Sequence, residues 1–204
     1  MTASYKGGVG KSTVAVSLAR HIADYDENAR VGVLNWDKAK TVTKFIARHG
    51  NERLFDFDEV PDEVSEAATH LIIDTKGSAE SLQKITDYEE DLDALVIVCD
   101  TGDDSLEMAA ELLGELDEWK FPAEKIFVLI NKVNRTSEDK YHIPYVVIPS
   151  IPENFPGVRA IKTFIPLSEG IKTSIEREKG TRALTPIAKV SLRDAFDELL
   201  DYIK

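Results

Sequence analysis

The sequence contains one cysteine, Cys99, and no long apolar run. A single cysteine excludes an internal disulfide, and its position inside the apolar stretch 95–99 favours a buried structural thiol over a reactive one. No stretch approaches the roughly 18 consecutive apolar residues that a membrane span needs. Only five residues precede the glycine-rich loop that begins at Lys6, too few for a signal peptide. These absences predict a protein of the reducing cytoplasm.

Basic residues are in the minority. Lys and Arg number 25 against 37 Asp and Glu, and the net charge of −12 argues against a general affinity for nucleic acid. The basic residues are unevenly spread, because residues 159–193 hold eight of them with only three acids, a local charge of +5. We expect any DNA-contacting surface to come from this segment, unless it is simply a charged helix surface without a ligand. The candidates are Lys162, Lys172, Arg177, Lys179, Arg182 and Lys189.

Short apolar runs alternate with amphipathic stretches, and a length of 204 residues suits one domain over 1–204. This order predicts an α/β fold, with a mostly parallel twisted sheet of about six or seven strands and helices on both faces. Two segments stay open: 55–64 as a loop or short edge strand, and 160–165 as a strand or an irregular arm. The expected strands are 2–5, 31–36, 70–74, 94–99, 126–130 and 145–148; the expected helices are 12–25, 38–48, one ending at Ile85, 105–119, 168–178 and 186–202.

The most informative stretch is the loop Lys6-Gly7-Gly8-Val9-Gly10-Lys11-Ser12-Thr13. Its glycines allow positive φ and bring backbone N–H groups close to a ligand, and the following helix adds its dipole and unpaired amides. Lys11 supplies a mobile cation, and Ser12 supplies a hydroxyl suited to Mg²⁺. The loop therefore predicts a phosphate-binding site for a nucleotide, with residues 7–13 as its contacts.

Polar residues follow the expected strands. Asp37, Asp74, Thr101 and Asn131 each come at or just after the end of an apolar run. Because ligands of open parallel sheets bind beyond the carboxyl ends of the strands, we expect these residues to meet beside the loop. Asp74 fits the role of holding Mg²⁺, and Gly77 is placed to offer its N–H to the terminal phosphate. The open alternatives are a carboxylate that caps the next helix and an ordinary turn glycine.

The loop has a lysine at its first position as well as before the serine, and it resembles the deviant Walker A loop of the ParA/MinD family of ATPases. There the first lysine reaches across a dimer interface to the phosphates held by the partner subunit, which implies that role for Lys6. The resemblance also implies that Asp37 orients the attacking water, although Asn35 stands where the family has another acid. Asn131 resembles the asparagine with which some members read the adenine edge. A helix cap for Asp37 and a plain strand-end residue for Asn131 remain open.

The resemblance implies a small ParA-like ATPase that uses ATP and Mg²⁺ and lacks the N-terminal DNA-binding extension of larger members. ATP would close a sandwich homodimer that binds DNA without sequence preference and associates with the nucleoid. A ParB-like adaptor on a cargo would stimulate hydrolysis. The alternatives are a MinD-like membrane-positioning ATPase, a metabolic ATP-dependent ligase, and a switch that barely hydrolyses ATP. No membrane partner is expected, because four acids among residues 194–204 would be repelled by anionic lipid.

Overall fold

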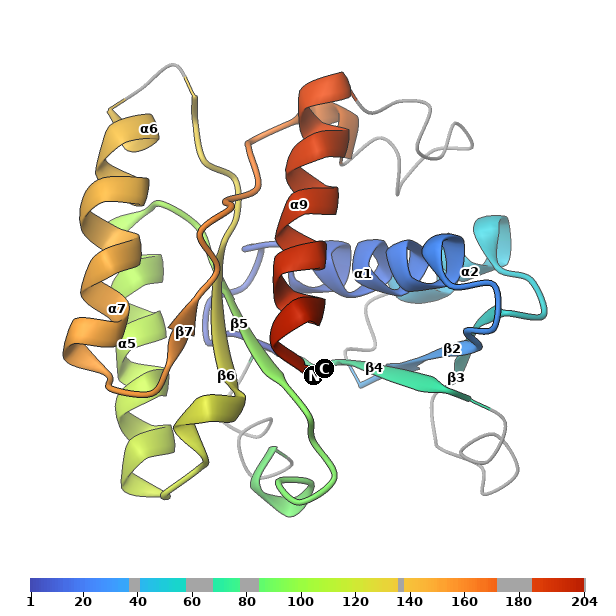
Figure 1. Cartoon of the computed structure of the whole chain (residues 1–204), viewed down its shortest axis with the longest axis horizontal. Helices are drawn as coiled ribbons and strands as arrows, with labels where there is room; N and C mark the ends of the chain where they lie inside the picture. Colours follow the sequence, from blue (N-terminus) through green and yellow to red (C-terminus); the bar gives the residue numbers. More distant parts are fainter. Residues whose placement is uncertain (37–40, 58–67, 78–84, 136–137, 172–184, 204) are drawn as a thin grey trace.

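The structure is a computed structural model that describes residues 1–36, 41–57, 68–77, 85–135, 138–171 and 185–203. A seven-stranded sheet runs through it in the order β3-β2-β4-β1-β5-β6-β7, and every neighbouring pair is parallel (Figure 1). This confirms the predicted α/β architecture. The strands are β1 (Thr2–Ala3), β2 (Val31–Asn35), β3 (Leu54–Phe57), β4 (His70–Asp74), β5 (Leu95–Cys99), β6 (Ile126–Ile130) and β7 (Arg159–Ala160).

Helices cover both faces of the sheet (Figure 1). On one face lie α1 (Lys11–Tyr25), α2 (Thr41–His49) and α9 (Pro186–Ile203), and on the other lie α5 (Asp103–Glu118), α6 (Asp139–His142) and α7 (Ile148–Asn154). A short 3₁₀ turn, Ala123–Lys125, precedes β6. Alternate residues of each central strand point to opposite faces, so the buried strands supply two separate apolar clusters.

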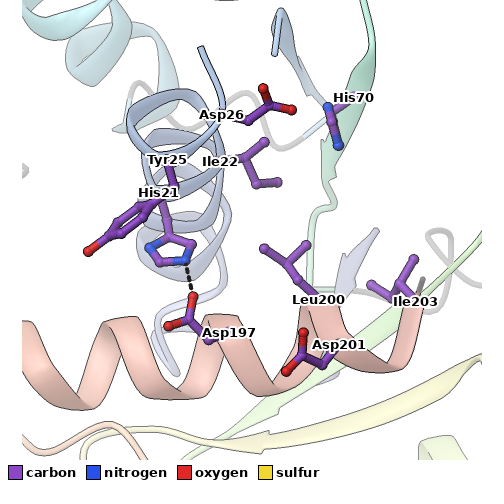
Figure 2. A pocket seen from close by; sticks show the side chains of 9 residues that line it. All are labelled: His21, Ile22, Tyr25, Asp26, His70, Asp197, Leu200, Asp201 and Ile203. Atoms are coloured by element: carbon purple, nitrogen blue, oxygen red, sulfur yellow. Dashed lines mark hydrogen bonds and ion pairs between the residues drawn. The ribbon is translucent and has the colours of Figure 1, made fainter. Parts of the chain in front are cut away.

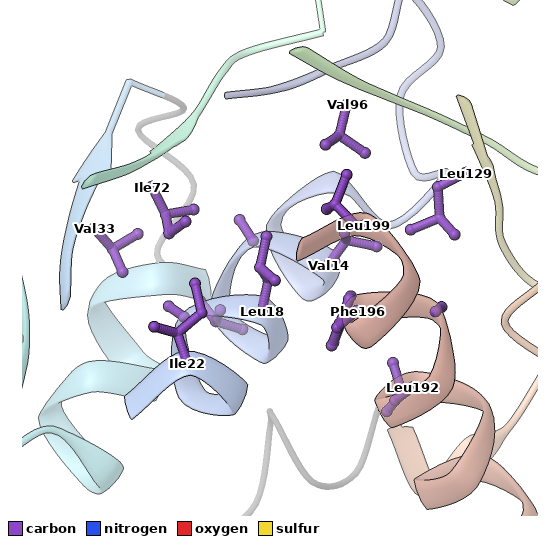
Figure 3. Packing of buried hydrophobic residues seen from close by; sticks show 14 of the residues in the cluster. Val14, Leu18, Ile22, Val33, Ile72, Val96, Leu129, Leu192, Phe196 and Leu199 are labelled. Atoms are coloured by element: carbon purple, nitrogen blue, oxygen red, sulfur yellow. The ribbon is translucent and has the colours of Figure 1, made fainter. Parts of the chain in front are cut away.

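The cluster under α1 and α9 fixes the helix that follows the glycine-rich loop (Figure 3). Val14 and Leu18 of α1 pack with Phe196 and Leu199 of α9 and with side chains of β2, β4, β5 and β6. Phe196 is only 1% exposed. Full burial of each such side chain stabilises the fold by about 1.5–3 kcal/mol. The apolar side of the last helix is therefore occupied by the domain itself.

The two open segments are assigned where they are described; residues 58–64 of the first lie outside the described residues. Residues 54–57 form β3, a short edge strand paired with β2. Only Arg159 and Ala160 form β7, and the chain beyond them continues irregularly to a single parallel bridge between Val133 and Pro166. Of the predicted helix 168–178, only residues 168–171 are described, and 169–171 are helical.

The strand predicted over 145–148 is wrong. These residues belong to a continuous helical stretch in which a π-helical turn, Ile143–Val147, joins α6 to α7. The Ile148 N–H donates to the Ile143 carbonyl, five residues back, and this wider turn accommodates the prolines at the start of the π and α7 segments. Ile143, Ile148 and Ile151 are all buried on one side. The spacing of three between Ile148 and Ile151 fits an α-helix, and the spacing of five between Ile143 and Ile148 fits the wider π turn between them, a signal that the four prolines of this region had obscured.

Candidate functional site

The glycine-rich loop joins β1 directly to α1 at the carboxyl edge of the sheet. Gly8 and Gly10 have φ of +80° and +100°, a backbone region that disfavours residues with a side chain. Gly10 is the N-cap of α1, and its carbonyl accepts the first helical bond from the Val14 N–H at 2.9 Å. The loop thus delivers the positive end of the α1 dipole to its concave side, which suits an anion.

Lys11 and Gly77 come together across this edge, as the sequence suggested. Lys11 is buried at 6% exposure. A Cβ added to Gly77 would lie 2.9 Å from Lys11 Nζ and 3.2 Å from the Ser4 carbonyl oxygen. The turn after β4 therefore approaches the loop closely, its backbone lies beside the cation, and a side chain at position 77 would displace the Lys11 ammonium.

Asp74 ends β4 and is completely buried. The Thr2 hydroxyl donates to its Oδ1 at 3.3 Å, and the Thr75 hydroxyl donates to the Thr2 carbonyl at 2.9 Å. These contacts fix the end of β4 against β1, next to the loop. Ser12 lies half-buried in the first turn of α1. The site thus pairs a carboxylate and a hydroxyl, oxygen donors of the kind that Mg²⁺ prefers.

Asn35 stands beside Asp74, because the two residues are register partners in neighbouring parallel strands. Its amide nitrogen donates to the Thr43 hydroxyl at 3.4 Å, and its Oδ1 is buried with no hydrogen-bond partner within the described residues. A second carboxylate here would repel a fully buried one, so the neutral amide has a physical reason. Asp37, the predicted water-orienting residue, lies outside the described residues.

Asn131, directly after β6, contacts the loop. Its amide nitrogen donates to the Val9 carbonyl at 2.7 Å, and its own oxygen accepts the Lys132 backbone N–H at 2.9 Å. A Cβ on Gly10 would lie only 2.4 Å from the same amide nitrogen. The side chain is 4% exposed in total. The Asn131 amide nitrogen therefore binds the loop backbone, and its oxygen binds the backbone of the next residue.

Two further contacts, one to the loop and one to Tyr5 just before it, were missed from the sequence. The Lys132 ammonium donates to the Gly8 carbonyl, and Lys132 itself has a positive φ of 59°. The Tyr5 hydroxyl donates to Glu115 of α5 at 2.5 Å, and burial together with this carboxylate raises the pKa of Tyr5. For Lys132, the available signal was its place directly after Asn131. For Tyr5, no sequence pattern links it to a residue 110 positions away.

Lys6 lies at the rim of the loop. Its Nζ is 3.7 Å from Oδ1 of Asp100, which follows β5, and the two side chains are 31% and 22% exposed. The sequence predicted Lys6 as a functional cation but gave Asp100 no part.

The basic segment is only partly described. Lys162 and Lys189 are exposed, whereas Lys172, Arg177, Lys179 and Arg182 lie outside the described residues. Two other arginines of the segment are engaged within the fold. Arg193 pairs with Asp194 at 2.7 Å, and Arg159 stacks over the Tyr202 ring at 5.0 Å. Among the described basic residues of 159–193, two of four are thus engaged by neighbouring side chains.

A groove of about 610 Å³ lies away from the loop, between the end of α1, the start of β4 and the end of α9 (Figure 2). Its lining combines apolar side chains such as Ile22 and Leu200 with His21 and Asp197, which bridge α1 and α9 at 2.8 Å. Because His70 begins β4, the groove marks the amino edge of the sheet, opposite the loop. It forms no part of the phosphate site.

The comparison with protein families settles the family. The model of the CobQ/CobB/MinD/ParA nucleotide-binding domain matches residues 1–181. The chain belongs to this family. It is therefore a nucleotide-binding ATPase, as the glycine-rich loop indicated. Among curated proteins, no relative matches.

Solved structures share the fold along the whole chain. McdA from Cyanthece, in its apo form, superposes with a TM-score of 0.72 at 16% identity, covering 97% of both chains. A ParA family ATPase from Chlorobium tepidum gives 0.66 at 17% identity, covering 97% of this chain and 95% of that one. The cell division protein MinD from Aquifex aeolicus gives 0.69 at 16% identity, with 98% and 95% covered. These likenesses show the fold alone.

Proposed function

We propose that this ATPase binds ATP with Mg²⁺ at the loop and acts as a ParA-like positioning protein. The loop amides and Lys11 bind the phosphates, while Ser12 and Asp74 hold the metal, Asp74 through water. The observation that supports this is the meeting of a buried lysine, a buried carboxylate and a side-chain-free turn at Gly77 beside one helix N-terminus. Mg²⁺ neutralises charge that develops on the phosphates during hydrolysis. Asp37 orients the attacking water.

ATP closes a homodimer in which Lys6 reaches the phosphates of the other subunit. The position of Lys6 supports this: its ammonium lies at the partly exposed rim of the loop, whereas Lys11 is buried inside it. One loop thus carries one lysine for its own nucleotide and one that remains accessible to a second copy.

The ATP dimer binds DNA through the basic segment, without sequence preference, and an adaptor on the cargo stimulates hydrolysis. Lys162 and Lys189 are the described candidates, joined by Lys172, Arg177, Lys179 and Arg182. A dimer doubles this patch, and binding by phosphate neutralisation weakens steeply as salt rises. A lipid-binding role is disfavoured because Phe196 and Leu199 of α9 are buried in the domain. None of the helices in the described part of the chain has the length and apolarity for a membrane crossing.

The test measures retention on random-sequence DNA with ATP, ADP and no nucleotide, over a series of salt concentrations. We expect retention with ATP only, and a loss of retention at high salt. Lys6→Ala should abolish it, while Lys162→Glu and Lys189→Glu, tested singly, should each weaken it. Lys44→Glu is the matched control, since Lys44 is an exposed lysine on α2, outside the basic segment. Equal retention with ADP refutes the ATP-dependent switch, and no retention at any salt refutes DNA binding; either result leaves the ligase as the alternative.

A further inference from the structure

Lys6 has a resting position within its own subunit. Its Nζ lies 3.7 Å from Asp100 Oδ1, and a Cβ on Gly102 would lie 3.4 Å from the same Nζ. The ammonium therefore sits over the short loop that leads from β5 into α5. This position is on the same subunit, whereas the role proposed above requires Lys6 to contact another copy.

Both ends of this contact have a fixed backbone. The Ser4 hydroxyl accepts the Lys6 N–H and donates to the Lys6 carbonyl, both at 3.0 Å. On the other side, Asp100 Oδ1 accepts the Gly102 N–H at 3.2 Å, and the Asp100 N–H donates to the Ser105 hydroxyl at 3.0 Å. The carboxylate is thus held by the Gly102 N–H and its backbone by Ser105 of α5, and the flexible four-carbon stem of Lys6 is the part that can move.

The ion pair between Lys6 and Asp100 is weak enough to be replaced by a stronger partner. A charge-assisted hydrogen bond between an ammonium and a carboxylate is about 2.7–2.9 Å long, so 3.7 Å is an ion pair without a short hydrogen bond. Both side chains are partly exposed, and such pairs are weak and screened by salt. A nucleoside triphosphate, with its several negatively charged oxygens, is a stronger partner for the same ammonium than one carboxylate.

We propose that Asp100 is a restraining residue that holds Lys6 in the unassembled subunit and competes with the nucleotide of a second copy for it. This inference rests on the proposed ATP-dependent dimer. Asp100 therefore raises the nucleotide concentration or occupancy at which the dimer forms. The phosphates of another copy then draw Lys6 away from Asp100.

The experiment compares the full chain with Asp100→Asn and the matched control Asp103→Asn. Asp103 is an exposed acid in the first turn of α5, three residues further along, so both variants lose the same local charge. The dimer dissociation constant is measured by sedimentation with a non-hydrolysable ATP analogue and Mg²⁺. We expect Asp100→Asn to tighten the dimer about 2- to 25-fold, because two weak pairs are released for each dimer. Asp103→Asn should stay within about twofold.

A second measurement does not need the dimer: the rate of acetylation of Lys6 in the nucleotide-free subunit, read by mass spectrometry. Asp100→Asn should label Lys6 faster than Asp103→Asn does. Unchanged labelling, or a dimer that is no tighter in Asp100→Asn than in the control, overturns the restraint. A wild-type chain that binds the analogue but remains monomeric refutes the sandwich dimer, and with it the regulatory role, while the labelling rate still reports whether the pair exists.

Discussion

Asn131 offers the sharpest test of how the phosphate loop is held. Its amide nitrogen donates to the Val9 carbonyl at 2.7 Å, and the residue is 4% exposed, so water cannot readily replace it. Asn131→Ala removes this donor and leaves the carbonyl unpaired in the interior, which destabilises the protein by about 1–3 kcal/mol. For a chain of this size each kcal/mol lowers the midpoint of thermal unfolding by about 2–4 °C.

The same substitution separates two roles for Asn131. If Asn131 supports the loop, Asn131→Ala should lower the affinities for ATP and GTP by a similar factor, because the loop contacts phosphates that both nucleotides share. If Asn131 reads the adenine edge, the substitution should lower the affinity for ATP more than the affinity for GTP, with little change in the free energy of unfolding. We expect the first result, measured by urea unfolding and by titration with fluorescent ATP and GTP analogues.

Asn154→Ala is the matched control. The Asn154 amide also donates to a backbone carbonyl, that of Ser150 at 2.8 Å, but on the exposed surface. We expect this variant to stay within about 0.5 kcal/mol of the wild type. The loop-supporting role is refuted if Asn131→Ala is as stable as Asn154→Ala, or if it changes the preference between ATP and GTP.

Three further outcomes are expected. Gly77→Ala places a methyl group 2.9 Å from Lys11 Nζ, so the affinity for nucleotide should fall about tenfold or more. The circular dichroism spectrum should stay unchanged, and an undiminished affinity would contradict the close approach of Gly77 to Lys11. Asn35→Asp puts a carboxylate beside buried Asp74, and repulsion between the two raises the pKa of one of them. Without Mg²⁺ the variant should therefore be less stable than wild type at pH 7 and match it near pH 3, where these carboxyl groups are protonated in both the folded and the unfolded chain. Equal stability of the variant and wild type at both pH values would count against the repulsion. Burial raises the pKa of the Cys99 thiol from 9.0 to about 12, so the unfolded chain loses this proton at a lower pH than the folded one. The free energy of unfolding, measured with urea, should therefore fall more steeply between pH 9 and 11 in wild type than in Cys99→Ala. Parallel pH profiles of the two proteins would refute this effect of burial.

Much of this architecture could be predicted because each prediction needed only local patterns. The apolar runs at 31–35 and 126–130 are continuous, since parallel strands covered on both faces have no polar side. The loop is contiguous in sequence and carries its own backbone chemistry. Gly77 and Asp74 could be placed because the carboxyl ends of parallel strands meet at one edge.

The contacts that were missed join residues distant in sequence. Nothing in the order of residues 5 and 115 indicates their hydrogen bond, and the Lys6–Asp100 pair depends on β1 and β5 being neighbours. The helical stretch around Ile143 was missed for a different reason. Prolines signal extended chain when considered one at a time, yet the starts of the π turn and of α7 each accept one, and Pro152 lies inside α7.

The hydrogen bonds from Asn131 and Lys132 have a consequence for how a nucleotide enters. In a planar trans peptide the C=O and the following N–H point in opposite directions. Holding the carbonyls of Gly8 and Val9 toward β6 therefore turns the N–H groups of Val9 and Gly10 away from it. These two peptide planes are oriented when the chain folds, so the incoming phosphates meet donors already aimed and bind without the entropy loss of ordering them.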